Sequence, residues 1–165
     1  VQISSEVGKG TRIEIFLPAS QVEAEKVSTN RNPEKGLVGK ASGKVLIVDD
    51  EVDLLEVTSS YVRDLGFKVL PAVDGNLALK LLEENPDIEY LLTDVVMPGG
   101  INGVSLAQQV RKRLPNIKIL YMSGFPSGVI ADKSGIELDA PLLTKPFSFE
   151  ELISAMDDLI CEVAA

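Results

Sequence analysis

The sequence contains no histidine, a single cysteine and no long hydrophobic run. One cysteine, Cys161, cannot form an internal disulfide, and this fits a reducing, cytoplasmic location. No segment approaches the roughly 20 apolar residues of a membrane-spanning helix, and no signal-peptide pattern is present. We therefore expect no membrane contact by this chain. It begins at Val1 and not at methionine, so we expect a fragment of a longer protein, whose other parts can include a membrane anchor.

An excess of basic residues is also missing. The 16 basic residues are outnumbered by 25 acidic ones, and the formal net charge is −9. Nonspecific binding to DNA or to an anionic membrane surface needs a basic patch, so neither is expected. With 165 residues, of which 45% are hydrophobic, the chain is predicted to fold around one real core rather than to be disordered.

Residues 1–18 and 19–42 differ in character from the rest. Two extended runs, Val1–Val7 and an alternating one around Ile13, flank the turn-forming Gly8–Thr11, and this pattern predicts a β-hairpin. Alone, such a hairpin is too small to be stable.

Residues 19–42 lack periodicity and are rich in serine, asparagine, proline, glycine and mixed charge, which predicts a flexible linker.

Residues 43–165 alternate short apolar runs with helix-period segments. We predict five strands, each followed by a helix. The strands are expected at Val45–Val48, Lys68–Ala72, Glu89–Leu92, Lys118–Tyr121 and Leu142–Thr144. Gly66 is expected to end the first helix, and Ser148 and Glu151 form a capping box at the start of the last. This alternation predicts an α/β, flavodoxin-like domain with a doubly wound, five-stranded parallel sheet in the order 2-1-3-4-5.

Polar side chains follow four of these strands. Asp49 and Asp50 end the first, Asp94 the third and Ser123 the fourth, while Lys145 follows the fifth. The carboxyl ends of parallel strands meet at one edge of the sheet, where ligands bind in this kind of fold. Three carboxylates there would repel one another unless a cation compensates them, and they suit a hard divalent cation such as Mg²⁺.

The same edge carries the parts of a phosphate site. A carboxylate can attack a phosphoryl group and hold it as an acyl phosphate, while a metal and a fixed lysine neutralise its charge. Asp94 is the best candidate nucleophile because it stands alone at the end of the central strand. Lys145 and the hydroxyl of Ser123 can then bind phosphoryl oxygens.

Four motifs in this order resemble the receiver domain of two-component response regulators: VLIVDDE, TDVVMPGGINGVSLA, LYMSGF and LLTKPF. The resemblance implies that Asp94 is the phosphoacceptor of a phosphorelay, so the chain would be a phosphoprotein in signal transduction. It implies that Lys145 pairs with the phosphoryl group and that Ser123 is a switch hydroxyl. Lys145–Pro146 resembles the family's cis peptide bond.

The resemblance also implies a magnesium site. Asp50 and Asp94 would bind Mg²⁺ directly, with the backbone carbonyl of Val96 as a third protein ligand. Asp49 would act mostly through water.

A second resemblance covers the hairpin. SEVGKGTRIEIFLP resembles the last glycine box and closing hairpin of a histidine kinase ATP-binding domain. Residues 1–18 would then be a remnant of that domain and residues 43–165 the receiver of a hybrid sensor histidine kinase. Because the chain has no histidine and no complete ATP site, the donor would be a phosphohistidine domain upstream or on another chain. A histidine phosphotransfer protein is a possible next acceptor.

Two positions depart from the family's pattern. Leu142 stands where the family often has the aromatic residue of its switch, so rotamer coupling from Ser123 is not expected to work through an aromatic ring. Val96 is apolar and cannot position an attacking water, which predicts slow loss of the phosphoryl group.

Other interpretations of the same residues remain open at this point. Asp49 and Asp50 can simply cap a helix, Asp74 with Gly75 is typical of a turn, and Cys161 is expected to be an inert packing residue. A phosphate-independent, receiver-like binding module would explain Leu142. An aspartate-based phosphohydrolase would need a second carboxylate two residues after its nucleophile, where this chain has valine.

Overall fold

The computed structural model describes residues 1–16, 41–98, 100–126 and 138–161. The chain divides into two compact units, Val1–Asn32 and Pro33–Ala165. Most of the predicted linker lies outside the described residues. Residues 127–137, where the sequence predicts the helix after the fourth strand, lie outside them as well.

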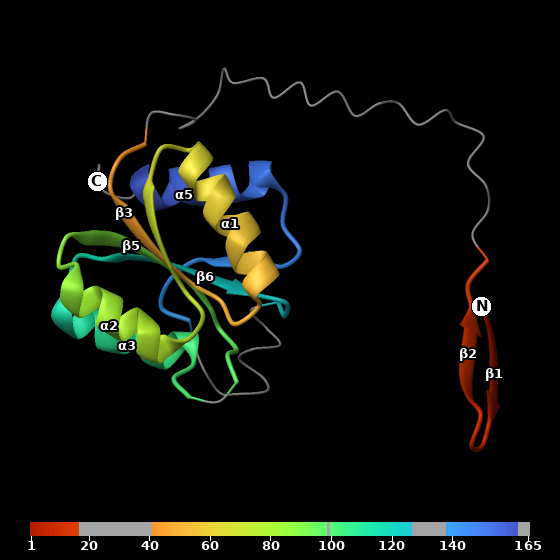
Figure 1. Ribbon diagram of the computed structural model, residues 1–165. Helices are drawn as coiled ribbons and strands as arrows, with labels where there is room; N and C mark the ends of the chain where they lie inside the picture. Colours follow the sequence, from red (N-terminus) through yellow and green to blue (C-terminus); the bar gives the residue numbers. More distant parts are fainter. Residues whose placement is uncertain (17–40, 99, 127–137, 162–165) are drawn as a thin grey trace. The chain divides into compact units, whose positions relative to one another are not determined.

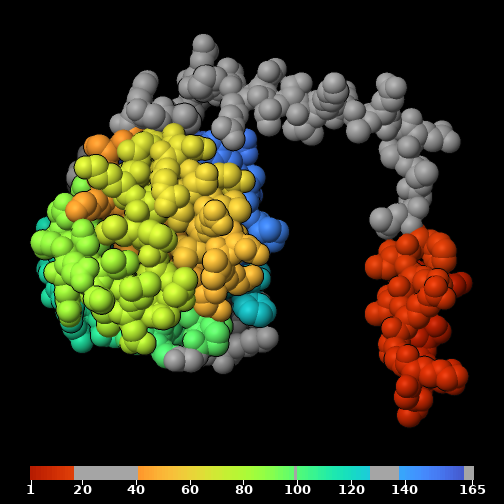
Figure 2. Space-filling view, in the orientation of Figure 1, coloured from red at the N-terminus to blue at the C-terminus, as the bar shows by residue number. Residues whose placement is uncertain are grey.

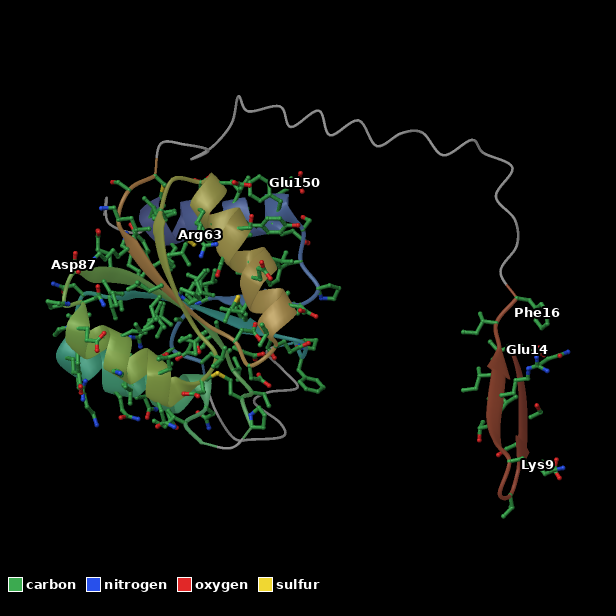
Figure 3. All side chains as sticks on the ribbon, in the orientation of Figure 1. Lys9, Glu14, Phe16, Arg63, Asp87 and Glu150 are labelled. Atoms are coloured by element: carbon green, nitrogen blue, oxygen red, sulfur yellow. The ribbon has the colours of Figure 1, made fainter. Side chains whose placement is uncertain are left out.

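The first unit contains the predicted hairpin. Strands β1 (Gln2–Glu6) and β2 (Gly10–Glu14) pair antiparallel, with Ile3 opposite Ile13. The turn uses two glycines at positive φ, Gly8 and Gly10, a conformation that costs a residue with a side chain more. The side chains of the hairpin stand out into solvent along its length (Figure 3).

The second unit is built on a five-stranded, wholly parallel sheet (Figure 1). Its strands are β3 (Lys44–Val48), β4 (Lys68–Ala72), β5 (Ile88–Asp94), β6 (Lys118–Ser123) and β7 (Leu142–Thr144). They lie in the order β4-β3-β5-β6-β7, which confirms the predicted 2-1-3-4-5 arrangement. Strand β5 is therefore central, while β4 and the three-residue β7 are edges.

Helices cover both faces of this sheet. Helices α1 (Val52–Asp64) and α5 (Phe149–Cys161) pack on one face, and α2 (Gly75–Glu84) and α3 (Gly103–Arg113) on the other (Figure 1). In the space-filling view the surface toward the viewer is formed largely by α1, β4 and α2, and the central strands are hidden (Figure 2). Covering both faces is what allows a strand to be apolar along its whole length.

Strand β3 shows how the core is divided. Leu46 and Val48 belong to the cluster under α2 and α3, whereas Val45 and Ile47 belong to the cluster under α1 and α5. Because successive side chains of a strand point to opposite faces of the sheet, one unbroken apolar run contributes to the hydrophobic core on each face. This explains why all four residues before Asp49 are apolar and buried, instead of alternating with polar residues.

The helix boundaries confirm some sequence signals and correct others. Ser148 and Glu151 form the predicted capping box, each backbone N–H donating to the other's side chain at 2.7 and 3.2 Å. Gly66 follows α1 with a φ of 109°. Asp74 is not a turn residue but the N-cap of α2. Cys161 is exposed, so the prediction of a packing residue is wrong.

Among the described residues, every helix is too short or too polar to cross a bilayer.

Candidate acidic phosphoacceptor site

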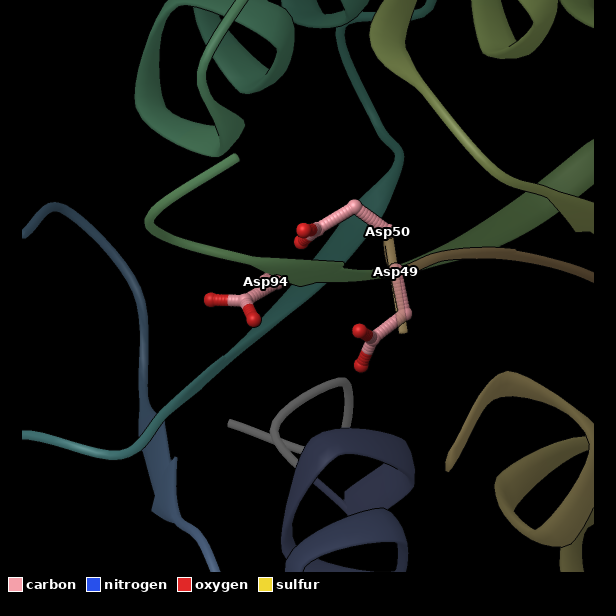
Figure 4. A group of neighbouring side chains, drawn as sticks. All are labelled: Asp49, Asp50 and Asp94. Carbon is pink, nitrogen blue, oxygen red and sulfur yellow. The ribbon is translucent and has the colours of Figure 1, made fainter. Parts of the chain in front are cut away.

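The strand ends bring the predicted acidic residues together. Asp49 and Asp50 follow β3 and Asp94 ends β5, and these two strands are hydrogen-bonded neighbours. One carboxylate oxygen from each of the three lies within 4.8 Å of the others. Figure 4 shows the three side chains gathered at this edge of the sheet. The prediction that the three carboxylates meet at the carboxyl ends of neighbouring strands is confirmed.

Lys145 lies between two of these carboxylates. Its Nζ is 2.7 Å from Asp49 Oδ2 and 2.6 Å from Asp94 Oδ2, and all three side chains are at least nine-tenths buried. Burial alone would lower the pKa of Lys145, but its hydrogen bonds to both carboxylates raise the pKa above its usual value. The amine is therefore held in its charged form, as a buried ion pair requires.

Backbone amides fix the carboxylates from the other side. The N–H of Glu51 donates to Asp49 Oδ1 at 3.1 Å, and the N–H of Val96 donates to Asp94 Oδ1 at 3.0 Å. Burial raises the pKa of Asp49, an effect that Lys145 and the Glu51 amide oppose. The N-cap of α1 is Glu51, without a side-chain capping bond, so the interpretation of the aspartates as helix caps is wrong.

The donor set fits a divalent cation. Three carboxylates face one lysine, so within the described part of the chain negative charge remains uncompensated at a partly buried edge. Asp50 is exposed, whereas Asp49 and Asp94 are buried. Hard oxygen ligands with an open, solvated side suit Mg²⁺, which binds through a few carboxylates and retains waters.

Ser123 is almost completely buried at the end of β6. Its Oγ accepts a hydrogen bond from the N–H of Phe125 at 3.0 Å. Together with Asp94 and Lys145 it lines a pocket of about 490 Å³. The other residues around this pocket are mainly apolar: Glu51, Leu54, Val96, Gly124, Phe125, Pro146 and Phe147. The predicted nucleophile, amine and hydroxyl thus meet in one cavity.

The peptide bond between Lys145 and Pro146 is cis, as the resemblance implied. The N–H of Lys145 donates to the carbonyl of Ser123 at 2.7 Å. This backbone hydrogen bond connects Lys145 directly to the end of β6, which carries Ser123.

Two residues that support Asp94 were not identified from the sequence. A Cβ on Gly103 would lie 1.9 Å from the carbonyl oxygen of Asp94, so only glycine fits the first turn of α3 against this strand. The buried hydroxyl of Thr93 donates to the same oxygen at 3.0 Å. The only sequence signal was the glycine at the start of a predicted helix, which we interpreted as loop and helix-entry geometry.

Comparison with known proteins places these observations in a family. Residues 45–157 match the response regulator receiver domain family. The sensor kinase CckA of Brucella abortus (strain 2308) is 30% identical over 166 residues, an alignment that covers 97% of this chain. The chain spans only 18% of that kinase.

Solved structures agree with this match. The receiver domain of the hybrid histidine kinase CckA superposes with a TM-score of 0.59 at 31% identity, covering 72% of this chain and 99% of that one. A response regulator receiver protein from Sinorhizobium medicae WSM419 gives a TM-score of 0.64 at 30% identity, covering 73% and 95%. With its fold, its acidic site and these relatives taken together, the chain belongs to the response regulator receiver domain family of two-component phosphorelays.

Proposed function

We propose that this receiver domain accepts a phosphoryl group from a phosphohistidine onto Asp94, in a reaction that depends on Mg²⁺. The observation that carries the proposal is the bridge from Lys145 to Asp49 and Asp94 at 2.7 and 2.6 Å. A charged lysine held beside the nucleophilic carboxylate of Asp94 can form hydrogen bonds to the oxygens of a phosphoryl group bound there and neutralise part of their charge.

The transfer is a displacement at phosphorus. A carboxylate oxygen of Asp94 forms the new P–O bond as the P–N bond to the donor imidazole breaks, and the imidazole nitrogen keeps the electron pair. The product is an acyl phosphate on Asp94. Lys145 Nζ stays charged throughout and exchanges one of its carboxylate contacts for a phosphoryl oxygen.

We assign the metal ligands as the resemblance implies: Asp50 and Asp94 directly, and the backbone carbonyl of Val96. A role for Asp49 through water is likewise assigned from the resemblance, because its two oxygens accept hydrogen bonds from Glu51 N–H and Lys145 just as those of Asp94 accept from Val96 N–H and Lys145. Bound Mg²⁺ would neutralise charge on the transferring group. The protein's part is to hold the carboxylates at one edge.

Ser123 is proposed as the switch hydroxyl. Its oxygen accepts the Phe125 N–H, which leaves its own hydrogen available to a phosphoryl oxygen. The aromatic partner of this switch in many relatives is replaced by Leu142, which packs partly buried against the core under α2 and α3.

We further propose that the chain is the receiver end of a hybrid histidine kinase. Residues 1–18 would be the closing hairpin of the kinase's ATP-binding domain, residues 19–42 a linker, and residues 43–165 the receiver. The alignment with the sensor kinase covers 97% of the chain, so it includes most of the hairpin, and this supports the proposal. The division into two units supports it as well.

The partners follow from this context. The donor is the phosphohistidine domain of a kinase, in cis or in trans, because the chain contains no histidine of its own. A histidine phosphotransfer protein would be the next acceptor. We propose a cytoplasmic location for this part of a parent protein that can be membrane-anchored, with no contact to DNA.

The direct test is to incubate the protein with acetyl phosphate and Mg²⁺ and to measure its intact mass. We expect one added phosphoryl group on the wild type, none on Asp94→Asn, and none when EDTA removes the metal. If neither acetyl phosphate nor a phosphorylated kinase domain labels Asp94, the proposal is wrong, and a phosphate-independent binding module becomes the better description.

A further inference from the structure

Lys145 owes its position to a very short strand. Strand β7 has three residues, lies at the edge of the sheet and pairs only with β6, through Tyr121–Leu142, Met122–Leu143 and Ser123–Thr144. Lys145 follows it at once. A one-residue slip of such a strand would turn every side chain to the opposite face and remove Nζ from the carboxylates.

A side-chain contact holds the segment that enters β7. The hydroxyl of Tyr121 donates to Asp139 Oδ1 at 2.9 Å, and the N–H of Tyr121 donates to the carbonyl of Pro141 at 2.9 Å. Tyr121 is fully buried, and a buried hydroxyl must have a partner. Asp139, although exposed, is the partner that this hydroxyl has in the described part of the chain.

Asp139 is also bound from helix α3. Arg111 forms an ion pair with Asp139 Oδ2, and its second guanidinium nitrogen donates to the Asp139 carbonyl at 3.2 Å. One carboxylate thus contacts β6 through one oxygen and α3 through the other. Its position is therefore set by contacts with two separate elements of the domain, one strand and one helix.

We propose that Asp139 is a positioning residue for the phosphoryl-transfer site: with Tyr121 and Arg111 it fixes the register of β7 on β6 and so holds Lys145 Nζ between Asp49 and Asp94. The contact lies at one end of β7, and the Lys145 N–H bond to the Ser123 carbonyl lies at the other. This inference rests on the proposed function of Asp94 and Lys145, but its structural half can be tested without phosphorylation.

The first measurement is amide hydrogen exchange of the whole chain by NMR. Asp139→Ala is expected to lower the protection of the Lys145 and Tyr121 N–H groups, and Asp139→Asn, which keeps an oxygen for the Tyr121 hydroxyl, to retain most of it. Asp87→Ala is the matched control, since Asp87 is another exposed aspartate in an ion pair, with Lys44 at the amino end of β3. Unchanged protection in Asp139→Ala would overturn the inference.

The second measurement is the rate of phosphorylation by acetyl phosphate at saturating Mg²⁺. We expect Asp139→Ala and Tyr121→Phe to lower the rate about tenfold through misplacement of the amine. Titration with MgCl₂ should show no loss of metal affinity, whereas general loosening of the domain would weaken metal binding in parallel. In a Lys145→Ala background, Asp139→Ala should have no additional effect.

The two proposals fail in different ways. If the wild type takes up phosphate and Asp139→Ala does so equally fast, the positioning role is wrong and the function stands. If the effects of Asp139→Ala and Lys145→Ala multiply, Asp139 does not act through Lys145. If the wild type takes up no phosphate from any donor while exchange at Lys145 still depends on Asp139, the proposed function fails and the register role stands.

Discussion

Gly103 lies directly against the backbone of Asp94, so closely that a Cβ at position 103 would approach the Asp94 carbonyl oxygen to 1.9 Å. The Gly103 N–H also donates to the carbonyl of Val95 at 3.2 Å. The first turn of α3 and the end of β5 therefore form one packed unit around the proposed phosphoacceptor, with no room for relaxation by a flexible side chain.

This contact predicts a large effect from the smallest possible substitution. Gly103→Ala should force α3 away from β5, lower the free energy of unfolding by roughly 1–3 kcal/mol and slow phosphorylation of Asp94. Urea denaturation and the acetyl phosphate assay measure the two effects. Gly100→Ala is the control, since a Cβ there meets only Asn76 at 3.8 Å. Equal stability of the two variants would contradict the packing argument.

Removal of the buried amine should make the protein dependent on metal. In Lys145→Met, Asp49 and Asp94 lose their shared cation, and breaking a buried ion pair in this way costs about 3–5 kcal/mol. Mg²⁺ should restore part of this loss, so the increase in Tm on adding MgCl₂ should exceed that of the wild type. Lys44→Met, which loses its ion pair with Asp87 at the amino end of β3, should respond to MgCl₂ as the wild type does. An equal Mg²⁺ response in Lys145→Met would argue against a competition between amine and metal.

Two hydroxyls in α1 are expected to destabilise the fold. Thr58 Oγ1 and Ser59 Oγ are buried, and neither has a hydrogen-bond partner in the described part of the chain. Since an unsatisfied buried polar group costs about 1–3 kcal/mol, Thr58→Val and Ser59→Ala should each raise the free energy of unfolding by about 1 kcal/mol. Ser60→Ala, at an exposed neighbour, reports the change in helix propensity alone. The idea is wrong if Ser59→Ala gains no more than Ser60→Ala in urea denaturation.

Two tyrosines should make stability fall at alkaline pH. Burial raises the pKa of both Tyr90 and Tyr121 above the usual value of about 10. The folded state therefore holds these protons more tightly than the unfolded state, so their contribution is complete below about pH 10 and is lost as the pH rises through the folded-state pKa. Tyr121→Phe should flatten this decline in urea denaturation, and the phenolate absorbance should lose a component that titrates above the usual tyrosine range. Loss of a component that titrates in the usual tyrosine range instead would show that Tyr121 ionises normally.

The apolar side chain of Val96 should prolong the phosphorylated state. Val96 is 57% exposed and lines the pocket over Asp94 together with Phe125, so its side chain offers an attacking water no hydrogen bond. Val96→Asn, whose side-chain amide can hydrogen-bond and orient a water, should lose the phosphoryl group from the acyl phosphate about tenfold faster.

The decay of the phosphorylated mass after removal of the donor measures this rate. Val96→Ala separates two explanations, because it opens the pocket without adding a polar group. A wild-type half-life of seconds with Mg²⁺ present would contradict the slow loss that the sequence predicts.

The sheet and its acidic edge were predictable because both depend on pattern. Apolar runs of strand length, alternating with helices, define a parallel sheet, and parallel strands must bring residues such as Asp49 and Asp94 to one edge. The exposure of Cys161 could also have been read from periodicity, since it falls two residues after Leu159 and away from the buried stripe of α5.

The contacts that position the site were not predictable in this way. Gly103 against Asp94, and Asp139 against Tyr121 and Arg111, join residues that are nine to 28 positions apart through the exact approach of two elements. Neither the helix or strand propensity of single residues nor the spacing of apolar residues indicates how closely two elements approach each other. The unpaired hydroxyls of α1 are equally invisible in the sequence, because serine and threonine occur at both exposed and buried positions of helices.

The strand order has a mechanical consequence. Asp94 ends the central strand β5, which has two strands on each side of it in the sheet, whereas Ser123 ends β6 and Lys145 directly follows the edge strand β7. The phosphoryl group that we propose on Asp94 would be attached to the central strand, and the residues proposed to contact it would lie toward one edge of the sheet, where a strand has fewer paired neighbours. We therefore expect phosphorylation to displace β6 and β7 more than β4, which lies at the other end of the strand order.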